Sequence, residues 1–150
     1  MSKEQQLTIK NKRAAFEYAF IANYTAGIML TGTEVKAIRE GKANLGDAFC
    51  IFINEELWIK NMHISEFKQG SYNNHDPKRL RKLLLNKSEL RKIQSRVKEK
   101  GTTIIPVQLF FNERGIAKIE IAVAKGKKMF DKREDIKKKD IARELNRIDN

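Results

Sequence analysis

The feature that most constrains the fold is an alternation of residue types over residues 103–126, TIIPVQLFFNERGIAKIEIAVAKG. Successive side chains of a strand point to opposite faces, so two alternating runs about a polar turn indicate a β-hairpin. The segment therefore predicts a hairpin with its turn at residues 112–115, and Pro106 indicates an edge or a bulge in the incoming strand. One face of the second strand carries Ala117, Ile119, Ile121 and Val123, and the other carries Ile116, Lys118, Glu120 and Ala122.

Two earlier segments are also typical of strands. Residues 47–64, DAFCIFINEELWIKNMHI, predict a hairpin about a tight turn at residues 54–56, with its first strand buried on both faces. Residues 16–32 are rich in aromatic and β-branched residues and predict two short strands, interrupted at Asn23 and Gly27.

Three segments have patterns typical of helices. Residues 33–41 predict a helix with Thr33 as its N-cap. Residues 78–85, KRLRKLLL, predict a short basic helix, and residues 88–101 predict a longer one with Ser88 as its N-cap. The buried stripe of the longer helix is expected to consist of Leu90, Ile93 and Val97.

These elements together predict a mainly β fold. About six short antiparallel strands with about three helices favour a small antiparallel OB-like barrel, closed or partly closed. An open α+β sandwich is the alternative. We expect residues 1–124 to form the barrel with its flanking helices, and residues 125–150 to form a basic C-terminal tail. The apolar residues of the tail are too sparse for a stable isolated helix, so we expect the tail to be disordered in isolation.

The excess of basic residues is concentrated in two segments. The chain of 150 residues carries 31 Lys and Arg against 19 Asp and Glu, a formal net charge of +12. Residues 77–100 hold ten basic and two acidic side chains, residues 125–150 hold ten and six, and the rest of the chain is neutral. Such an excess repels itself unless a polyanion binds, so we favour RNA or DNA as a partner over a merely solvated helix face.

Candidate catalytic residues are few. Of the two histidines, His63 closes an apolar strand and His75 lies in a turn sequence, so both are expected to be structural. The sequence holds no HExxH, paired CxxC or Walker-type motif, and Cys50, between two apolar residues, is expected to be an inert core thiol. We predict no enzymatic activity of the chain's own, no cofactor and no metal.

The compartment follows from the same composition. A single cysteine cannot form an internal disulfide, which favours a reducing cytosol. No apolar run approaches the roughly 18–20 residues of a membrane span, and the first residues lack the apolar core of a secretory signal. We expect a cytoplasmic monomer with no membrane partner.

Three stretches of the chain resemble one known family. They are NKRAAFEY with AGIMLTGTEVKAIREGKANLGDAF (within 11–49), HDPKRLRKLLLNKSEL (75–90) and GIAKIEIAVAKGKKMFDKRE (115–134). These stretches are similar to the opening, the basic motif, and the last strand with the start of the tail in the transfer-messenger RNA-binding small protein B (SsrA-binding protein) family. The combination of GTEVK, RKLLL and GKK followed by DKR is specific, and the resemblance covers nearly the whole chain.

The resemblance implies a function and its partners. It implies a barrel that binds the tRNA-like domain of transfer-messenger RNA and delivers this RNA to stalled ribosomes for trans-translation, the rescue and tagging of incomplete nascent chains. The 70S ribosome is then a partner, with the tail forming a helix in the vacant decoding centre and mRNA channel. Elongation factor Tu and alanyl-tRNA synthetase are implied as indirect partners through the RNA.

The resemblance also implies which residues serve these roles. Asn11 offers amide donors and an acceptor to a base edge or a 2′-hydroxyl, Leu84 is either a core or a contact residue, and Phe130 is a candidate stacking group. The RNA-binding set comprises Asn11, Lys12, Arg13, Glu34, Lys36, Lys78, Arg79, Arg81, Lys82 and Leu84. The ribosome-facing tail set comprises Gly126, Lys127, Lys128, Phe130, Asp131, Lys132 and Arg133.

Two positions depart from the family's pattern. Thr25 stands where the family commonly has an acidic residue that is important for RNA binding, so that contact is either lost or supplied by the Thr hydroxyl. Ser65, Glu66 and Phe67 stand where the family often reads Ser-Pro-Tyr, which changes the expected path of the loop that follows.

Two functions remain open at this level. The first is recognition of a structured RNA, as in this family, and the second is a ribosomal or cold-shock-like protein that binds single strands. Single-strand readers carry aromatic side chains on their binding sheet. The aromatic residues of this chain are expected to lie mostly in the core, which favours folded RNA.

Overall fold

A closed ring of six antiparallel strands forms the centre of the structure, a computed structural model that describes residues 8–68 and 74–127. The ring runs β8–β4–β5–β7–β2–β9 and closes because β9 also pairs with β8. Its strands are β2 (Tyr18–Ile28), β4 (Phe49–Ile53), β5 (Glu56–Lys60), β7 (Arg81–Leu84), β8 (Thr102–Phe111) and β9 (Ala117–Gly126). The prediction of a small, mainly β barrel is confirmed.

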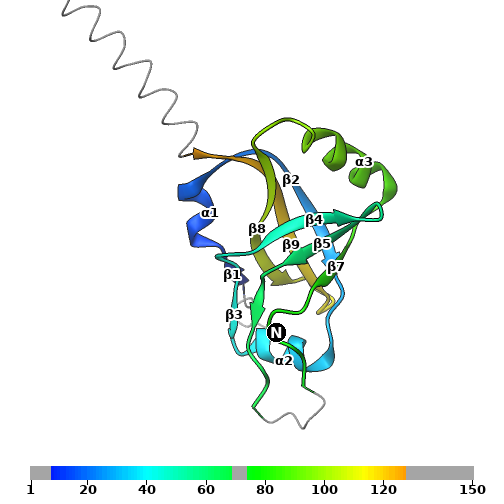
Figure 1. Ribbon diagram of the computed structural model, residues 1–150. Helices are drawn as coiled ribbons and strands as arrows, with labels where there is room; N and C mark the ends of the chain where they lie inside the picture. The colour runs from blue at the N-terminus through cyan, green and yellow to red at the C-terminus, as the bar shows by residue number, and fades with distance from the viewer. Residues whose placement is uncertain (1–7, 69–73, 128–150) are drawn as a thin grey trace, which may run out of the picture.

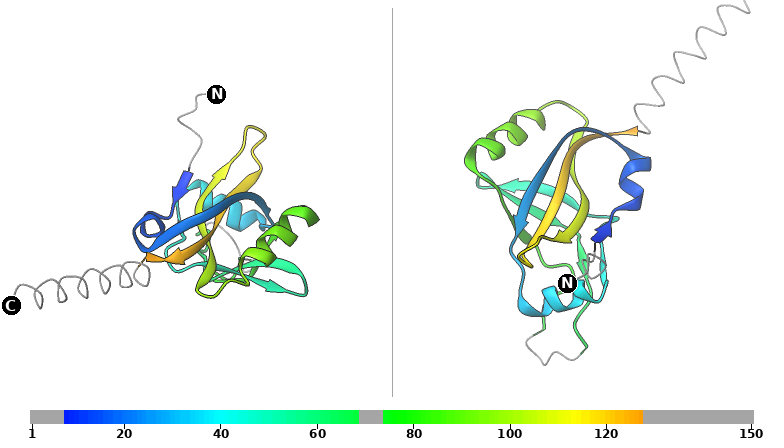
Figure 2. Two further views of the ribbon diagram at one scale, coloured as in Figure 1. Left: turned by 90° about the horizontal axis from the view of Figure 1, so that it is seen from above. Right: turned by 180° about the vertical axis from the view of Figure 1, so that it is seen from behind.

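The remaining elements lie around this ring. The short strand β1 (Thr8–Lys10) pairs with β8, and β3 (Ala43–Asn44) pairs with β6 (His63–Ile64). Helices α2 (Gly32–Arg39) and α3 (Lys87–Arg96) lie at opposite ends of the barrel, while α1 (Lys12–Glu17) lies against its side (Figure 1 and Figure 2).

The hairpin that the alternating pattern predicts is present as β8 and β9. Its turn forms because the Asn112 Oδ1 accepts hydrogen bonds from the N–H groups of Arg114 (3.0 Å) and Ile116 (2.9 Å), while Gly115 takes a φ of 75°. The register shifts between Pro106 and Gln108, which confirms the predicted bulge. The strand β9 continues to Gly126, two residues beyond the expected end of the barrel.

The prediction of two short strands in residues 16–32 is wrong, because β2 is one strand of 11 residues with a register shift between Phe20 and Ala22. Neither Asn23 nor Gly27, the two residues expected to interrupt it, breaks the strand. Asn23 is exposed and donates to Glu120 on the neighbouring strand at 2.6 Å. Gly27 lies opposite Leu84, where an added Cβ would stand 3.3 Å from the Leu84 Cβ, so glycine permits this close approach.

The predicted basic helix over residues 78–85 is also wrong, since Arg81–Leu84 form the strand β7 between β5 and β2. Arg81 and Leu83 point into the protein, while Lys82 and Leu84 point outward. Burial therefore alternates with the period of two that is typical of a strand. The alternation is not visible in the sequence, because a buried arginine occupies one of the inward positions in a run of basic residues.

Helices α2 and α3 begin earlier than predicted. Thr31 rather than Thr33 caps α2, and Asn86 rather than Ser88 caps α3. Each cap is part of a capping box that a glutamate completes three residues later. In the predicted stripe of α3, Ile93 is buried and its neighbours Leu90 and Val97 are half-buried.

The helix α1 was not predicted, because six residues with a single buried side chain leave little periodicity to detect. Ala14 packs with Ile105, Ala122 and Ala124 on the outside of the barrel, apart from the main core. The opposite side of α1 presents Phe16, which is 82% exposed.

The main core consists of aliphatic side chains, and none of the described aromatic residues is fully buried. The expectation that the aromatic residues lie mostly in the core is therefore wrong. The interior of a small barrel has room for branched and small side chains, and the aromatic residues that pack against the main core, Tyr24, Phe52 and Phe111, are themselves half-buried. The strand β4 is likewise not buried on both faces, since its residue Ile53 is exposed.

Cys50 is the fully buried residue of β4, and burial raises the pKa of its thiol, so it is an inert core residue as expected. Within the described ranges, no helix is long and apolar enough to cross a membrane.

Candidate nucleic-acid interface

The carboxylate of Glu34, fully buried at the first turn of α2, is bound by two arginines. Its Oε1 accepts from the Arg79 Nη2 at 2.5 Å, and its Oε2 accepts from the Arg81 Nε. Arg81 is fully buried and also donates to the Met62 carbonyl at 2.7 Å. The Thr31 N–H donates to the Glu34 Oε1 at 2.8 Å as part of the capping box. We call Glu34, Arg79 and Arg81 the buried cluster.

The pKa of Glu34 reflects this setting. Burial raises it, but the hydrogen bonds from Arg79 and Thr31 and the charge and hydrogen bond of Arg81 outweigh burial and hold the pKa below its usual value. The carboxylate is therefore charged at neutral pH, and it fixes two cations of β7 and the preceding loop against α2. In this position Glu34 and Arg81 present no side-chain atoms to a ligand, so any role in binding runs through the residues that they position.

Several predicted residues lie on the surface around the buried cluster. Lys36 and Lys78 are exposed, Arg79 is half-buried, and the ammonium of Lys36 lies 5.5 Å from the centre of the Phe67 ring. Lys82 faces outward and forms an ion pair with Glu56. Leu84 is 48% exposed, so its reading as a core residue is wrong and a contact role stays a prediction.

A second group of predicted residues lies at α1. Asn11 is 9% exposed, and its Nδ2 donates to the carbonyls of Leu45 (3.2 Å) and Pro106 (2.9 Å). The amide donors are thus used inside the fold rather than offered to a base edge. Asn11 fixes the start of α1, and this places Lys12 and Arg13 on the surface.

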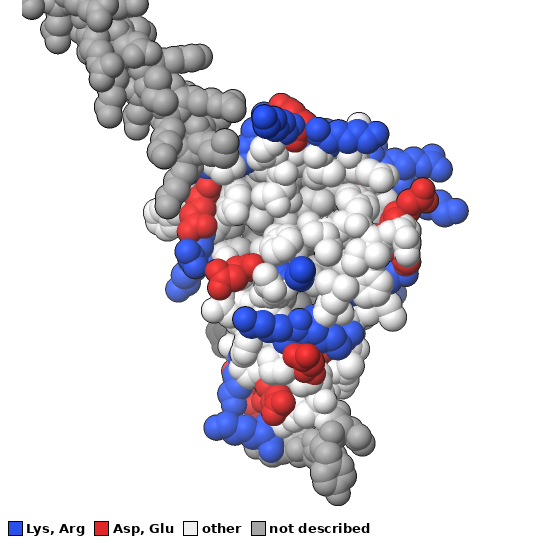
Figure 3. Space-filling model, in the orientation of Figure 1, with Lys and Arg blue, Asp and Glu red and all other residues white. Residues whose placement is uncertain are grey.

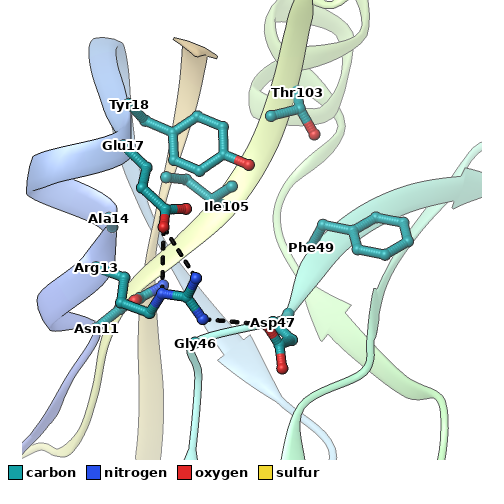
Figure 4. A pocket seen from close by; sticks show the side chains of 11 residues that line it. Asn11, Arg13, Ala14, Glu17, Tyr18, Gly46, Asp47, Phe49, Thr103 and Ile105 are labelled. Atoms are coloured by element: carbon teal, nitrogen blue, oxygen red, sulfur yellow. Dashed lines mark hydrogen bonds and ion pairs between the residues drawn. The ribbon is translucent and has the colours of Figure 1, made fainter. Parts of the chain in front are cut away.

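Arg13 lies between two acidic side chains, and we call these three residues the exposed cluster. Its guanidinium contacts Glu17 at 3.0 Å and Asp47 at 3.5 Å, and its side chain is 62% exposed (Figure 4). Glu17 follows Arg13 by four residues on α1, a spacing that sequence reading could have noted. Asp47 is 34 residues away in the sequence, and no local signal connects it to Arg13.

The helix α3 supplies a further basic surface. Basic side chains gather along the edge of the molecule over α3 and the segment that follows it (Figure 3). The exposed basic residues of this part of the chain are Lys87, Arg91, Lys92, Arg96, Lys98 and Lys100. Most of the charge excess predicted for residues 77–100 thus lies at the surface, as binding to a polyanion requires.

The two described residues of the tail set lie next to α1. Gly126 pairs with Tyr18, and the Lys127 Nζ donates to the Ala15 carbonyl at 2.8 Å. The remaining predicted tail residues, Lys128, Phe130, Asp131, Lys132 and Arg133, lie outside the described residues.

His75 is a structural residue, as expected. It is buried, and its ring nitrogens lie 2.9 Å from the Thr33 hydroxyl and 2.9 Å from the Ile64 carbonyl, which ties α2 to β6. Among the residues that the structure describes, no three His, Cys, Asp or Glu side chains are grouped so as to hold a metal ion.

Comparison with known proteins identifies the family. A family model described as SmpB protein matches residues 8–150. The chain belongs to the SmpB family. This membership confirms the resemblance found in the sequence.

Relatives of the SmpB family match nearly the whole chain. The SsrA-binding protein of Phocaeicola vulgatus is 60% identical over 146 residues, which cover 97% of this chain and 97% of that protein. The SsrA-binding protein of Cytophaga hutchinsonii is 61% identical over 144 residues, covering 96% and 94%. A chain of a solved structure described as "tmRNA-SmpB: a journey to the center of the bacterial ribosome" is 44% identical, with a TM-score of 0.69, and the match covers 79% of this chain and 83% of that one.

Proposed function

We propose that this chain binds transfer-messenger RNA (tmRNA) through its tRNA-like domain and delivers it to stalled ribosomes for trans-translation. The observation that carries the proposal is the match to SsrA-binding proteins along nearly the whole chain, together with the likeness to the SmpB chain of a tmRNA and ribosome structure. The single-strand reader is disfavoured on this ground. The position of the aromatic residues does not disfavour it, since none of the described ones is fully buried.

The described surface supports recognition of a folded RNA by its backbone. The buried cluster fixes Arg79 beside Lys36 and Lys78, and Asn11 fixes Lys12 and Arg13 at α1. Cations held at set positions on a rigid barrel fit phosphates that are themselves held in a folded RNA. Leu84, which is exposed beside Gly27 of the neighbouring strand, adds an apolar surface that the RNA can contact. The proposal gives these residues a binding role, and it gives the chain no catalytic step.

The finer parts of the proposal concern the tail and the other partners. We assign residues 128–150 to the vacant decoding centre and mRNA channel of the 70S ribosome. We further propose that elongation factor Tu and alanyl-tRNA synthetase meet the chain through the RNA, and that the chain acts as a monomer in the cytoplasm. These assignments are supported by the family membership and by the start of the tail beside α1.

The decisive experiment is sequencing of the RNA that copurifies with the full chain. One dominant species with a tRNA-like domain is expected. At a fixed salt concentration, the chain should bind this domain much more tightly than single-stranded oligomers of equal length. Equal affinities, or a mixture of unrelated RNAs, would refute the proposal.

A truncation separates the roles of barrel and tail. The cut should follow Lys127 rather than Ala124, because Lys125 and Gly126 still pair with β2. The truncated chain is expected to keep its affinity for the tRNA-like domain and to lose tagging of stalled nascent chains. Loss of RNA binding in a truncated chain that still unfolds cooperatively would contradict this division.

A further inference from the structure

A hollow of about 360 Å³ lies outside the barrel, between α1, the start of β4 and β8 (Figure 4). Its floor contains Ala14 and Ile105, which join α1 to the sheet in the small outer cluster. We call it the larger hollow, because a smaller one of about 180 Å³ adjoins it. None of its lining residues belongs to the buried cluster.

Aromatic rings flank the larger hollow. Tyr18 lines it on the side of α1 and Phe49 on the side of β4, where the Phe49 ring extends away from Tyr18 (Figure 4). Both residues are half-buried, and of the two rings it is the Tyr18 ring that points over the hollow (Figure 4). A flat apolar surface of this kind is what an unstacked nucleobase contacts in RNA-binding proteins.

Polar groups stand at the rim of the same hollow. The carboxylates of Glu17 and Asp47 accept hydrogen bonds from Arg13, and both retain lone pairs for other donors. Such acceptors suit the N–H groups on the edge of a base. They also repel a phosphate, and this restricts the direction from which a nucleotide could enter.

A smaller hollow of about 180 Å³ adjoins the larger one and has the opposite charge. It shares Asn11, Arg13 and Gly46 with the larger hollow, and it adds Lys10 and Lys12. Of the described residues that line it, none is acidic. A phosphate is therefore favoured in the smaller hollow and disfavoured at the rim of the larger one.

We propose that the two adjoining hollows bind one unstacked nucleotide of an RNA, with the base against Tyr18 in the larger hollow and the phosphate in the smaller hollow. Arg13 stands at the boundary, where its guanidinium is held in place by Glu17 and Asp47. The inference rests on the proposed function for the RNA that supplies the nucleotide. It adds a site for a single extruded base to a surface otherwise assigned to backbone contacts.

Mononucleotides test the site without the RNA. The full chain, labelled with ¹⁵N, is titrated with AMP, GMP, CMP and UMP, and with ribose 5-phosphate as a probe that lacks the base. At least one nucleotide should shift the amide signals of Tyr18, Ala48 and Phe49, which line the larger hollow alone, whereas ribose 5-phosphate should shift only those of the smaller hollow. If none of the four nucleotides shifts the signals of the larger hollow, the proposal is wrong.

A pair of matched variants tests the stacking. Tyr18→Leu removes the ring that points over the larger hollow (Figure 4), and Phe110→Leu removes a half-buried ring from the outer face of β8, outside both hollows. Loss of one stacked ring should weaken nucleotide binding by about five-fold or more, and Phe110→Leu should leave it unchanged. Equal effects of the two variants would overturn the stacking. Amide spectra of both variants show whether the fold is kept.

Photo-crosslinking identifies the occupant in the working complex. The full chain with p-benzoylphenylalanine in place of Phe49 is irradiated with the copurifying RNA, with and without 70S ribosomes. A crosslink to one unpaired nucleotide supports the proposal, whereas a crosslink to residues 128–150 of the same chain, or to paired nucleotides alone, overturns it. If no tRNA-like RNA copurifies, the proposed function fails, yet the mononucleotide titration still decides whether the site exists.

Discussion

The buried cluster and the exposed cluster both combine carboxylates with arginines, but in opposite ratios. In the first, one carboxylate holds two arginines and is shielded from water, while in the second, one arginine holds two carboxylates and is 62% exposed. A buried ion pair whose partner is removed leaves an uncompensated charge, whereas an exposed one is rescued by water. The same type of ion pair therefore stabilises the fold in the buried cluster and forms an adaptable surface in the exposed cluster.

This difference assigns different work to the two regions. The buried cluster keeps α2, β7 and the loop before β7 in one arrangement. The backbone positions of the surface lysines around it are fixed as a result. The exposed cluster keeps a guanidinium at the boundary of two hollows, where it remains free to contact a ligand.

The largest effect is expected from Glu34→Gln. The substitution leaves Arg81 buried without a counter-charge, so the free energy of unfolding should fall by about 3–5 kcal/mol. Urea denaturation followed by far-UV circular dichroism measures it. The matched substitution Glu17→Gln in the exposed cluster should cost less than about 1 kcal/mol, and similar losses in the two variants would remove the distinction between the clusters.

The pH dependence of stability gives the next largest effect. Because the pKa of Glu34 in the folded chain is depressed, its contribution to stability is complete above the ordinary glutamate pKa of about 4.3 and is lost as the pH falls through the folded value. The stability gap between the native chain and Glu34→Gln should therefore stay constant from pH 6 to about pH 5 and narrow as the pH falls further. Thermal unfolding at a series of pH values measures this gap. A gap that stays constant down to the acid-unfolding region would contradict a depressed pKa.

A smaller effect is expected from the lysines beside each cluster. The pairs Lys36→Gln with Lys78→Gln, and Lys10→Gln with Lys12→Gln, each remove two exposed cations. If both lysines of a pair meet phosphates of the tRNA-like domain, the slope of log affinity against log salt should decrease by about 1.4–1.8. Filter binding at four or more salt concentrations gives the slopes. A pair that leaves the slope unchanged does not lie at the RNA.

The smallest effect on stability is expected from Arg13→Gln. Its ion pairs are exposed, so the free energy of unfolding should change by less than about 1 kcal/mol. The same urea experiment measures it. A loss above about 2 kcal/mol would show that the exposed cluster is a stabilising element like the buried one.

The sequence predicts most of the strands because their alternation is local. The β8–β9 hairpin, its turn and its bulge all follow from residues 103–126, since side-chain alternation and turn chemistry need no distant contact. The family resemblance likewise depends on short motifs, and it is confirmed by the match over residues 8–150.

The errors occur where distant residues override local pattern. Arg81 faces inward on its strand because Glu34, 47 residues earlier in the chain, neutralises its charge. The local sequence KRLRKLLL does not contain that partner, so it indicates a basic helix. In the sequence alone Asn11 is a candidate RNA contact, but in the fold its amide donates to the carbonyls of Leu45 and Pro106. The hollows are formed by α1, β4 and β8 together, and no single segment of the sequence contains them.

The position of β9 in the ring has a consequence for the synthesis of the chain. β9 joins β2 to β8, and Tyr18 finds its partner Gly126 only after more than a hundred further residues have been added. A copy that ends before β9 leaves two unpaired strand edges, which are sites of aggregation and of recognition by the cell's quality control. Closure of the barrel thereby distinguishes a finished copy of this chain from an unfinished one.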